Sequence, residues 1–233
     1  MIFKGGFLLS YLIDIGRETV DLDFLVTRMN VEEKEIRDAI ERILFERLED
    51  GFAFSYEKIE LLNQPHMAYS GYRITLKVVF GKMKGKIQID IGVGDTVVPE
   101  SRTFSTFAYK GKPLFEGDVI LMVYPPETIF AEKLETVISK GVKNSRMKDY
   151  HDLLLLCREK GFLERNLLES SIKNTFSRRE TSYKRIVFDS EGLHGLQRLW
   201  TAHRSGLGLI AEELFLPTDI GEVISEINLI LQE

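Results

Sequence analysis

The sequence contains very little cysteine: Cys157 is the only one among 233 residues. A lone cysteine excludes an intrachain disulfide, which fits a protein of a reducing compartment. Cys157 stands in an apolar run with helical spacing, and no histidine occupies a suggestive position near it in the sequence. We therefore expect a buried structural thiol at this position and not a catalytic nucleophile.

The chain also lacks a long apolar segment and an excess of positive charge. It has no stretch of 18 apolar residues and no secretory-signal layout over residues 1–12, so we expect a cytoplasmic protein without a membrane partner. The net charge of −5 argues against a surface covered with basic residues for non-specific nucleic-acid binding. Two basic segments, 140–148 and 178–185, are either a local patch for nucleic acid or solvated helix ends and loops.

What is present is the pattern of a globular α+β protein. A chain of 233 residues with 44% hydrophobic content can bury a core without disulfides or structural metals. The predicted strands are 2–4, 19–26, 52–62, 72–80 and 84–91; the predicted helices are 7–13, 31–48 with Asn30 as N-cap, 127–139, 147–160, 163–176, 194–203 and 220–231. This order predicts a small mixed β-sheet core with flanking helices over residues 1–123, followed by a mainly helical region over residues 124–233.

Two aspartates one residue apart, Asp21 and Asp23, are the first chemical signal. Residues i and i+2 of a strand point to the same side, so the two carboxylates share one face while Leu22, Phe24 and Val26 face the other and can be buried. Two adjacent negative charges repel each other unless a cation neutralises them, and a divalent metal is one such cation. A solvated strand end explains the pair equally well.

A third carboxylate, Asp90, lies opposite the isoleucine face of an alternating run. If this strand lies beside that of Asp21 and Asp23, three carboxylates converge, and such an oxygen-only set suits Mg²⁺ or Mn²⁺. An ordinary strand-end aspartate is the alternative. The pair Gly5-Gly6 before a helix fits a phosphate site, because backbone without a Cβ can approach phosphate oxygens closely. A simple turn is the commoner explanation for two adjacent glycines.

Charged residues in the second half of the chain form another candidate group. Lys133 lies at the border of the apolar face of its predicted helix, where a lysine either extends to water or meets an anion such as a triphosphate. The run 145–152 holds Arg146 and Lys148 together with Asp149 and Asp152, which are i,i+3 neighbours on one helix face. These residues form a solvated ionic cluster, or the cations bind phosphate while the aspartates orient them. The four histidines show no metal-ligand spacing.

Together these motifs resemble the AbiEii family of nucleotidyltransferase toxins from abortive-infection and type IV toxin–antitoxin systems. The stretches that carry the resemblance are Lys4–Gly6, Arg17–Phe24, Ile89–Asp95, Tyr124–Lys133 and Asn144–Leu153, with weaker similarity at 175–179 and 199–200. They are distributed over most of the length of the chain. The resemblance implies a DNA-polymerase-β-like nucleotidyltransferase core whose active site is completed by the helical C-terminal region.

The resemblance also implies roles for the candidate residues. The implied metal ligands are Asp21, Asp23 and Asp90; the implied nucleotide-binding residues are Gly5, Gly6, Lys133, Arg146 and Lys148; and the implied catalytic residues are Asp21, Asp23, Asp90, Lys133 and Asp149. Studied members of the family use nucleoside triphosphates, and some add nucleotides to the acceptor end of tRNA. Asp90, at the third acidic position, would serve as a base or as a ligand.

Two departures from the family pattern concern the glycine pair. Phe7 stands where a hydroxyl residue commonly follows, so that phosphate contact is missing or is made by a backbone N–H. The sequence also begins three residues before Lys4, without the leading helix of many members. Either the start is trimmed, or the glycine loop is covered differently.

From these patterns we expect a magnesium-dependent enzyme that moves a nucleoside monophosphate from a triphosphate to an acceptor hydroxyl. The leading hypothesis is a phage-defence toxin acting on RNA at the tRNA 3′ end, with a cognate antitoxin as a further partner. One alternative is the same chemistry on a small molecule or a protein. The other is a catalytically degenerate module that binds nucleotide without turnover.

Overall fold

The computed structural model describes residues 1–27, 32–46, 50–62, 71–94, 97–105, 108–110, 112–113 and 117–231. The chain separates into two compact units, each described by itself below. The first, called the sheet unit, comprises Met1–Leu9 and Thr19–Pro125, and the second, called the helical unit, comprises Ser10–Glu18 and Pro126–Glu233. The grouping of Ser10–Glu18 with the helices is a feature that the sequence pattern did not indicate.

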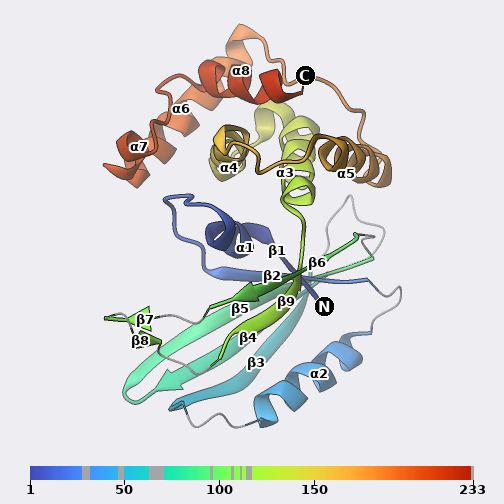
Figure 1. The fold of residues 1–233 in the computed structure, drawn as a ribbon, viewed down its shortest axis with the longest axis vertical. Coiled ribbons are helices and arrows are strands. Elements are labelled where there is room, and N and C mark those ends of the chain that lie inside the picture. Colours follow the sequence, from blue (N-terminus) through green and yellow to red (C-terminus); the bar gives the residue numbers. More distant parts are fainter. Residues whose placement is uncertain are drawn as a thin grey trace. The chain divides into compact units, whose positions relative to one another are not determined.

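The sheet unit is built on a seven-stranded mixed sheet with the strand order β3-β4-β5-β2-β1-β9-β6 (Figure 1). Two neighbouring pairs, β2 with β5 and β1 with β9, are parallel, and the others are antiparallel. The strands are β1 (Ile2–Lys4), β2 (Asp21–Val26), β3 (Phe52–Leu62), β4 (Gly71–Phe80), β5 (Met83–Val93), β6 (Glu100–Phe104) and β9 (Val119–Val123), and β7 (Ala108–Tyr109) pairs separately with β8 (Lys112–Pro113).

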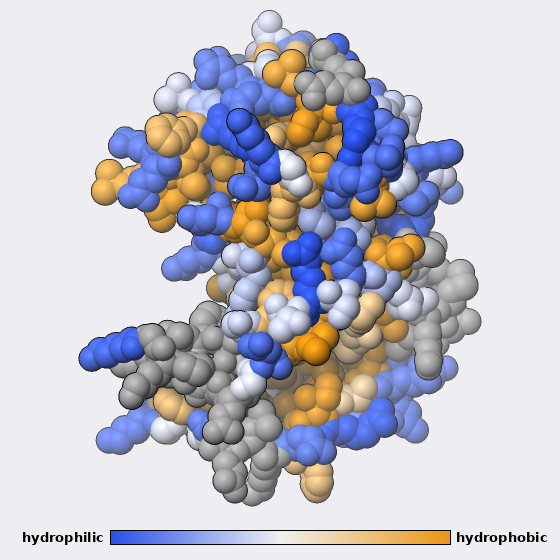
Figure 2. Space-filling view, in the orientation of Figure 1, coloured by the Kyte–Doolittle hydropathy of each residue, from blue (hydrophilic) through white to orange (hydrophobic). Residues whose placement is uncertain are grey.

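One face of this sheet is covered by α2 (Glu33–Phe45), which packs next to β3 (Figure 1). Ile36 and Ile40 of the helix form a core cluster with Ile74, Leu76 and Ile91 of the sheet. Hydrophilic residues cover most of the outward side of the helix (Figure 2), as in an amphipathic surface helix, although Ile43 and Phe45 near its end are exposed. A capping box of the side chains at positions 32 and 35 starts the helix; the predicted N-cap at position 30 lies outside the described residues.

The helical unit consists of helices that enclose a second apolar core. Pairs in contact are α3 with α4, α3 with α5, α4 with α8, and α6 with α8. The bounds are α3 (Pro126–Lys140), a 3₁₀ turn η1 (Gly141–Lys143), α4 (Met147–Arg158), α5 (Arg165–Arg178), α6 (Ser190–Leu207), α7 (Ile210–Glu213) and α8 (Ile220–Ile230). Trp200 is fully buried there, and its indole N–H donates to the Pro217 carbonyl at 2.8 Å. Among the described residues, no helix is long and apolar enough to cross a membrane.

The predicted α+β class and the mixed sheet are confirmed, and each predicted strand and helix has a counterpart in the structure. The elements that the pattern missed are the strands β6–β9 and the short helix α7. In β9 three of the five residues, Val119, Ile120 and Met122, are exposed. All five residues are nevertheless apolar, so the sequence lacks the alternation of polar and apolar residues that predicts a strand exposed on one face.

Candidate functional site

Carboxylates gather on one face of the sheet, where β2 and β5 lie side by side. These strands are parallel neighbours, with Asp23 opposite Asp90 and Asp21 opposite Gln88. Residues in register on adjacent strands point to the same face, so the three carboxylates share it. The intervening apolar residues of β2 face the other way, as predicted, and are half-buried: Leu22, Phe24 and Val26. Within the described ranges, however, no three acidic, histidine or cysteine side chains form a group that could hold a metal ion.

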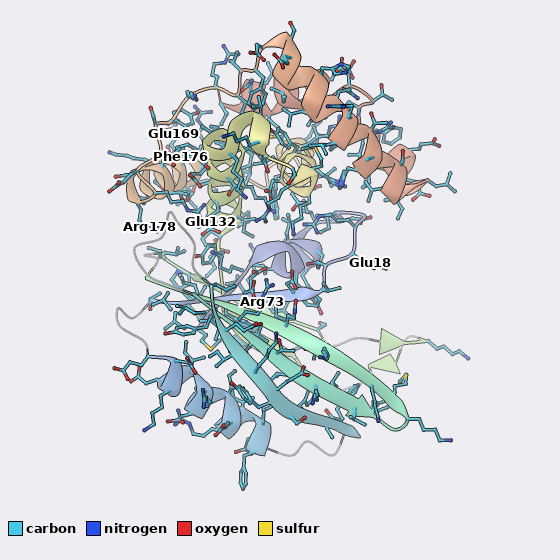
Figure 3. All side chains as sticks on the ribbon, turned by 180° about the vertical axis from the view of Figure 1, so that it is seen from behind. Glu18, Arg73, Glu132, Glu169, Phe176 and Arg178 are labelled. Carbon is cyan, nitrogen blue, oxygen red and sulfur yellow. The ribbon has the colours of Figure 1, made fainter. Side chains whose placement is uncertain are left out.

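Arg73 is a member of this group that the sequence did not reveal (Figure 3). It lies on β4 opposite Asp90, and its Nε and Nη2 donate to Oδ1 and Oδ2 of that carboxylate at 2.7 and 2.6 Å. This is the bidentate geometry of the strongest side-chain ion pairs. The hydrogen bonds that Arg73 donates to Asp90 raise the pKa of Arg73 above its ordinary value; desolvation opposes this shift, and the charges of Asp90, Asp21 and Asp23 add to it.

A second cation lies at the other end of the same row. Lys4 of β1 is opposite Asp23, so the row across four strands reads Arg73, Asp90, Asp23, Lys4. The Lys4 ammonium donates to the Tyr124 hydroxyl at 3.3 Å and lies 4.6 Å from the centre of that ring. Two adjacent carboxylates are thus flanked by one positive charge on each side.

Gly5 is required where the chain leaves β1 and enters α1 (Gly5–Leu12). Its φ of +78° lies in the left-handed region, and an added Cβ would fall 1.9 Å from Oδ2 of Asp23. Any residue with a Cβ would therefore collide with the Asp23 carboxylate, so only glycine fits at this position. The structure therefore connects the predicted glycine pair to the Asp21–Asp23 strand, while the role of Gly6 in phosphate binding stays a prediction.

In the helical unit, the side chains of α3 and α4 form a buried ionic cluster. Lys133 of α3 contacts Asp152 at 2.6 Å and Asp149 at 3.6 Å. Arg17 holds the same Asp152 in a bidentate pair, with Nε–Oδ1 at 2.8 Å and Nη2–Oδ2 at 2.6 Å. Nε of Arg146 lies 3.1 Å from Oδ2 of Asp149, which makes an ion pair but not a hydrogen bond. Among the described residues, this Oδ2 accepts no hydrogen bond.

This cluster has more positive than negative charges. Asp149 and Asp152 are both buried; of the four cations around them, Lys133 and Arg17 are half-buried, and Arg146 and Lys148 are exposed. Burial would raise the pKa of Asp152, but the charges of Lys133 and Arg17 outweigh it and hold that pKa well below the usual range. Desolvation and the nearby cations, first Arg146 and then Arg17, lower the pKa of Lys148. The region therefore favours an added anion.

Arg17 belongs to a stretch that carried the family resemblance, but no pattern in the sequence predicts its contact with Asp152. The two residues are 135 positions apart, and Arg17 lies outside any helix or strand. The structure thus brings together Lys133, Asp149 and Arg146 as candidates, and adds Arg17.

Two other residues of the helical unit are placed by the structure. His151 is fully buried, and its Nδ1 lies 2.9 Å from Nε2 of His203. The sequence did not indicate this pairing. Desolvation lowers the pKa of His151 to about 4, so the imidazole is neutral at pH 7. Cys157 is half-buried and not fully buried as expected. Desolvation still raises its pKa to about 12, so its thiol is protonated at pH 7 and is a poor nucleophile.

Replacing Asp152 tests the electrostatic balance of the cluster. We expect Asp152→Asn to lower the free energy of unfolding at pH 7 by about 3–5 kcal/mol, because it leaves two buried cations without their shared partner. The depressed pKa stabilises the wild type above about pH 4, and this stabilisation is lost as the pH falls toward the folded-state pKa. The difference between wild type and variant should therefore shrink from pH 7 to pH 2 in urea unfolding. An equal difference at every pH, or one no larger than that of the exposed Asp118→Asn control, would contradict the charge balance.

Replacing Gly5 tests the close contact with Asp23. Gly5→Ala should lower the free energy of unfolding by about 1–3 kcal/mol, because it combines a strained φ with a steric conflict. Gly6→Ala, at the next position of α1, is the matched control. The cost of Gly5→Ala should decrease in an Asp23→Ala background, as measured by urea unfolding; the same cost in both backgrounds would show that the carboxylate does not limit this position.

Comparison with known proteins places these features in a family. The model of the nucleotidyl transferase AbiEii toxin of type IV toxin–antitoxin systems matches residues 1–218. Two solved structures align with 100% of the chain: a candidate nucleotidyltransferase from H. pylori, with 14% identity, 84% of that chain covered and a TM-score of 0.46, and JHP933 from Helicobacter pylori, with 15% identity, 89% covered and a TM-score of 0.43. No curated protein matches the sequence. Because the family model spans nearly the whole chain, the protein belongs to the AbiEii family of nucleotidyl transferase toxins.

Proposed function

We propose that this protein transfers a nucleoside monophosphate from a nucleoside triphosphate to a hydroxyl group at the 3′ end of an RNA, with tRNA as the leading acceptor. The hydroxyl oxygen forms a bond to the α-phosphorus, the bond from that phosphorus to the bridging oxygen breaks, and pyrophosphate leaves. The hydroxyl proton passes to a base or to water. Family membership supports a nucleotidyltransferase toxin and implies an antitoxin partner; the acceptor and the metal are part of the proposal.

The carboxylates of Asp21 and Asp23 fit a divalent metal ion. They project from one face of β2, both are only partly buried, and a hard cation such as Mg²⁺ or Mn²⁺ prefers oxygen ligands. Two protein carboxylates suffice when phosphate oxygens and water complete the coordination, as is usual for Mg²⁺. When bound, such an ion neutralises charge on the phosphates and on the leaving pyrophosphate. Asp90 contributes the third negative charge beside Asp23.

The observation that carries this proposal is the close approach of Gly5 to Asp23. A glycine with φ of +78° begins a helix, and its Cα lies against the carboxylate. The backbone at the start of α1 and the Asp23 side chain are therefore held together, which brings the N-terminal end of a helix, with its favourable dipole for anions, next to the proposed metal-binding carboxylate. A triphosphate with its metal needs both kinds of partner. A backbone N–H of this glycine segment then replaces the hydroxyl contact that Phe7 cannot make.

In the helical unit, we assign the cluster of Lys133, Arg146 and Lys148 to the phosphates of the nucleotide. Its surplus of positive charge favours an added anion. Asp149 and Asp152 hold Lys133 in one place, so the lysine loses little freedom when the anion binds. Asp149 is therefore a positioning residue in this proposal.

The Asp21–Asp23 pair provides the first test. Asp21→Asn and Asp23→Asn should each lower label transfer from α-labelled triphosphates at least about 100-fold, because each removes charge that the metal needs. The control is Asp118→Asn, an exposed residue, and thermal unfolding should stay near wild type in all three variants. Total tRNA and small cationic acceptors are supplied in parallel. Transfer retained by both variants would overturn the assignment of the two aspartates. Transfer by the wild type to small acceptors alone would overturn the RNA acceptor. Nucleotide binding by the wild type without pyrophosphate release would show a catalytically degenerate module.

Lys133 provides the second test. Lys133→Met should raise the KM for the triphosphate about 10–100-fold, because a charge-assisted hydrogen bond contributes about 1.5–3 kcal/mol. Lys140→Met, at the exposed end of the same helix, is the matched control and should leave KM unchanged. An unchanged KM in Lys133→Met, with the protein folded, would remove Lys133 from the nucleotide site.

A further inference from the structure

Asp90 has both of its carboxylate oxygens engaged by one protein cation. Arg73 donates through Nε to Oδ1 at 2.7 Å and through Nη2 to Oδ2 at 2.6 Å. The two side chains are 33% and 20% exposed, so water screens this pair only in part. The Arg73 guanidinium therefore neutralises the Asp90 carboxylate, and no metal ion is needed to do so.

The position of this pair in the sheet connects it to the proposed metal ligands. Asp90 is opposite Asp23, and Arg73 is opposite Asp90, so Arg73 is two strands from Asp23. Neighbouring strands are about 4.8 Å apart, which places the Arg73 backbone about 10 Å from that of Asp23. At this separation, and with partial screening, a unit charge changes the binding of a divalent ion by about threefold to tenfold.

We propose that Arg73 is a fixed cation of the carboxylate cluster. It neutralises Asp90, leaves Asp21 and Asp23 as the carboxylates that hold the metal, and lowers the affinity of that pair for divalent ions. Arg73 is thus a positioning residue and not a metal ligand or a catalytic residue. The inference rests on the proposed metal-dependent function, and it assigns Asp90 to Arg73 where the sequence alone predicted a third metal ligand. The competing arrangement is one in which the metal displaces Arg73 and binds Asp90 directly.

Charge and ligand roles can be separated with four variants. Arg73→Gln makes the cluster one unit more negative, and Asp90→Asn makes it one unit less negative because Arg73 remains. The double variant Arg73→Gln/Asp90→Asn restores the wild-type net charge but lacks the third carboxylate. Arg73→Lys keeps the charge and loses the bidentate geometry. Lys77→Gln is the matched control, because Lys77 is an exposed cation on the same strand and the same face, four residues from Arg73.

The experiment is calorimetric titration of the full chain with Mn²⁺ at low ionic strength, without nucleotide, so that turnover does not enter. Thermal unfolding of each variant confirms that it is folded. We expect Arg73→Gln to bind Mn²⁺ about threefold to tenfold more tightly than wild type, and Asp90→Asn to bind it more weakly by a similar factor. The double variant, Arg73→Lys and Lys77→Gln should each stay within about twofold of wild type, and the differences should shrink at 0.5 M salt, where charges are screened within a few ångströms.

The double variant decides between the two arrangements. If it binds Mn²⁺ as weakly as Asp90→Asn or more weakly, Asp90 is a metal ligand and the proposal is overturned. Unchanged or weaker binding by Arg73→Gln also overturns it, because a merely structural role for Arg73 cannot tighten metal binding. Absence of Mn²⁺ binding by the wild type would overturn both this proposal and the metal-dependent function. Loss of label transfer in Asp21→Asn with a weakly binding double variant would overturn this proposal alone.

Discussion

The parallel pairing of β2 with β5 places Asp23 directly opposite Asp90, and two adjacent carboxylates require nearby positive charge. Cations occupy both ends of the same row, with Arg73 hydrogen-bonded to Asp90 and Lys4 opposite Asp23. A glycine follows Lys4 because any larger residue would meet the Asp23 carboxylate. The positions of Lys4, Gly5 and Arg73 are thus explained by two negative charges that lie side by side in the sheet.

In the helical unit the arrangement is reversed: a buried carboxylate, Asp152, is surrounded by cations. An isolated carboxylate inside a protein costs several kcal/mol, and Asp152 escapes that cost only because Lys133 and Arg17 both contact it. Such a cluster fixes the side chain of Lys133, and its surplus of positive charge leaves a preference for an anion. The two units therefore carry clusters of opposite net charge.

Much of this arrangement follows from the sequence, and the exceptions have physical reasons. Period-two alternation correctly put Asp21 and Asp23 on one face of β2, although the fully buried residue of that strand is Leu25, on the same face. Alternation alone does not say which residue lies across from Asp90. The hairpin after Phe80 contained that information: a two-residue turn that pairs Phe80 with Met83 also pairs Arg73 with Asp90. The contact of Arg17 with Asp152 left no such signal, because tertiary packing alone joins them.

Anomalous diffraction from crystals grown with Mn²⁺ and a non-hydrolysable triphosphate analogue would locate the metal relative to the three aspartates. If Asp21 and Asp23 bind the metal and Asp90 stays paired with Arg73, a manganese peak lies within coordination distance of both Asp21 and Asp23, and the Arg73–Asp90 ion pair is intact. A peak coordinated by Asp90 with Arg73 displaced, or no peak near the aspartates of β2, would contradict this assignment.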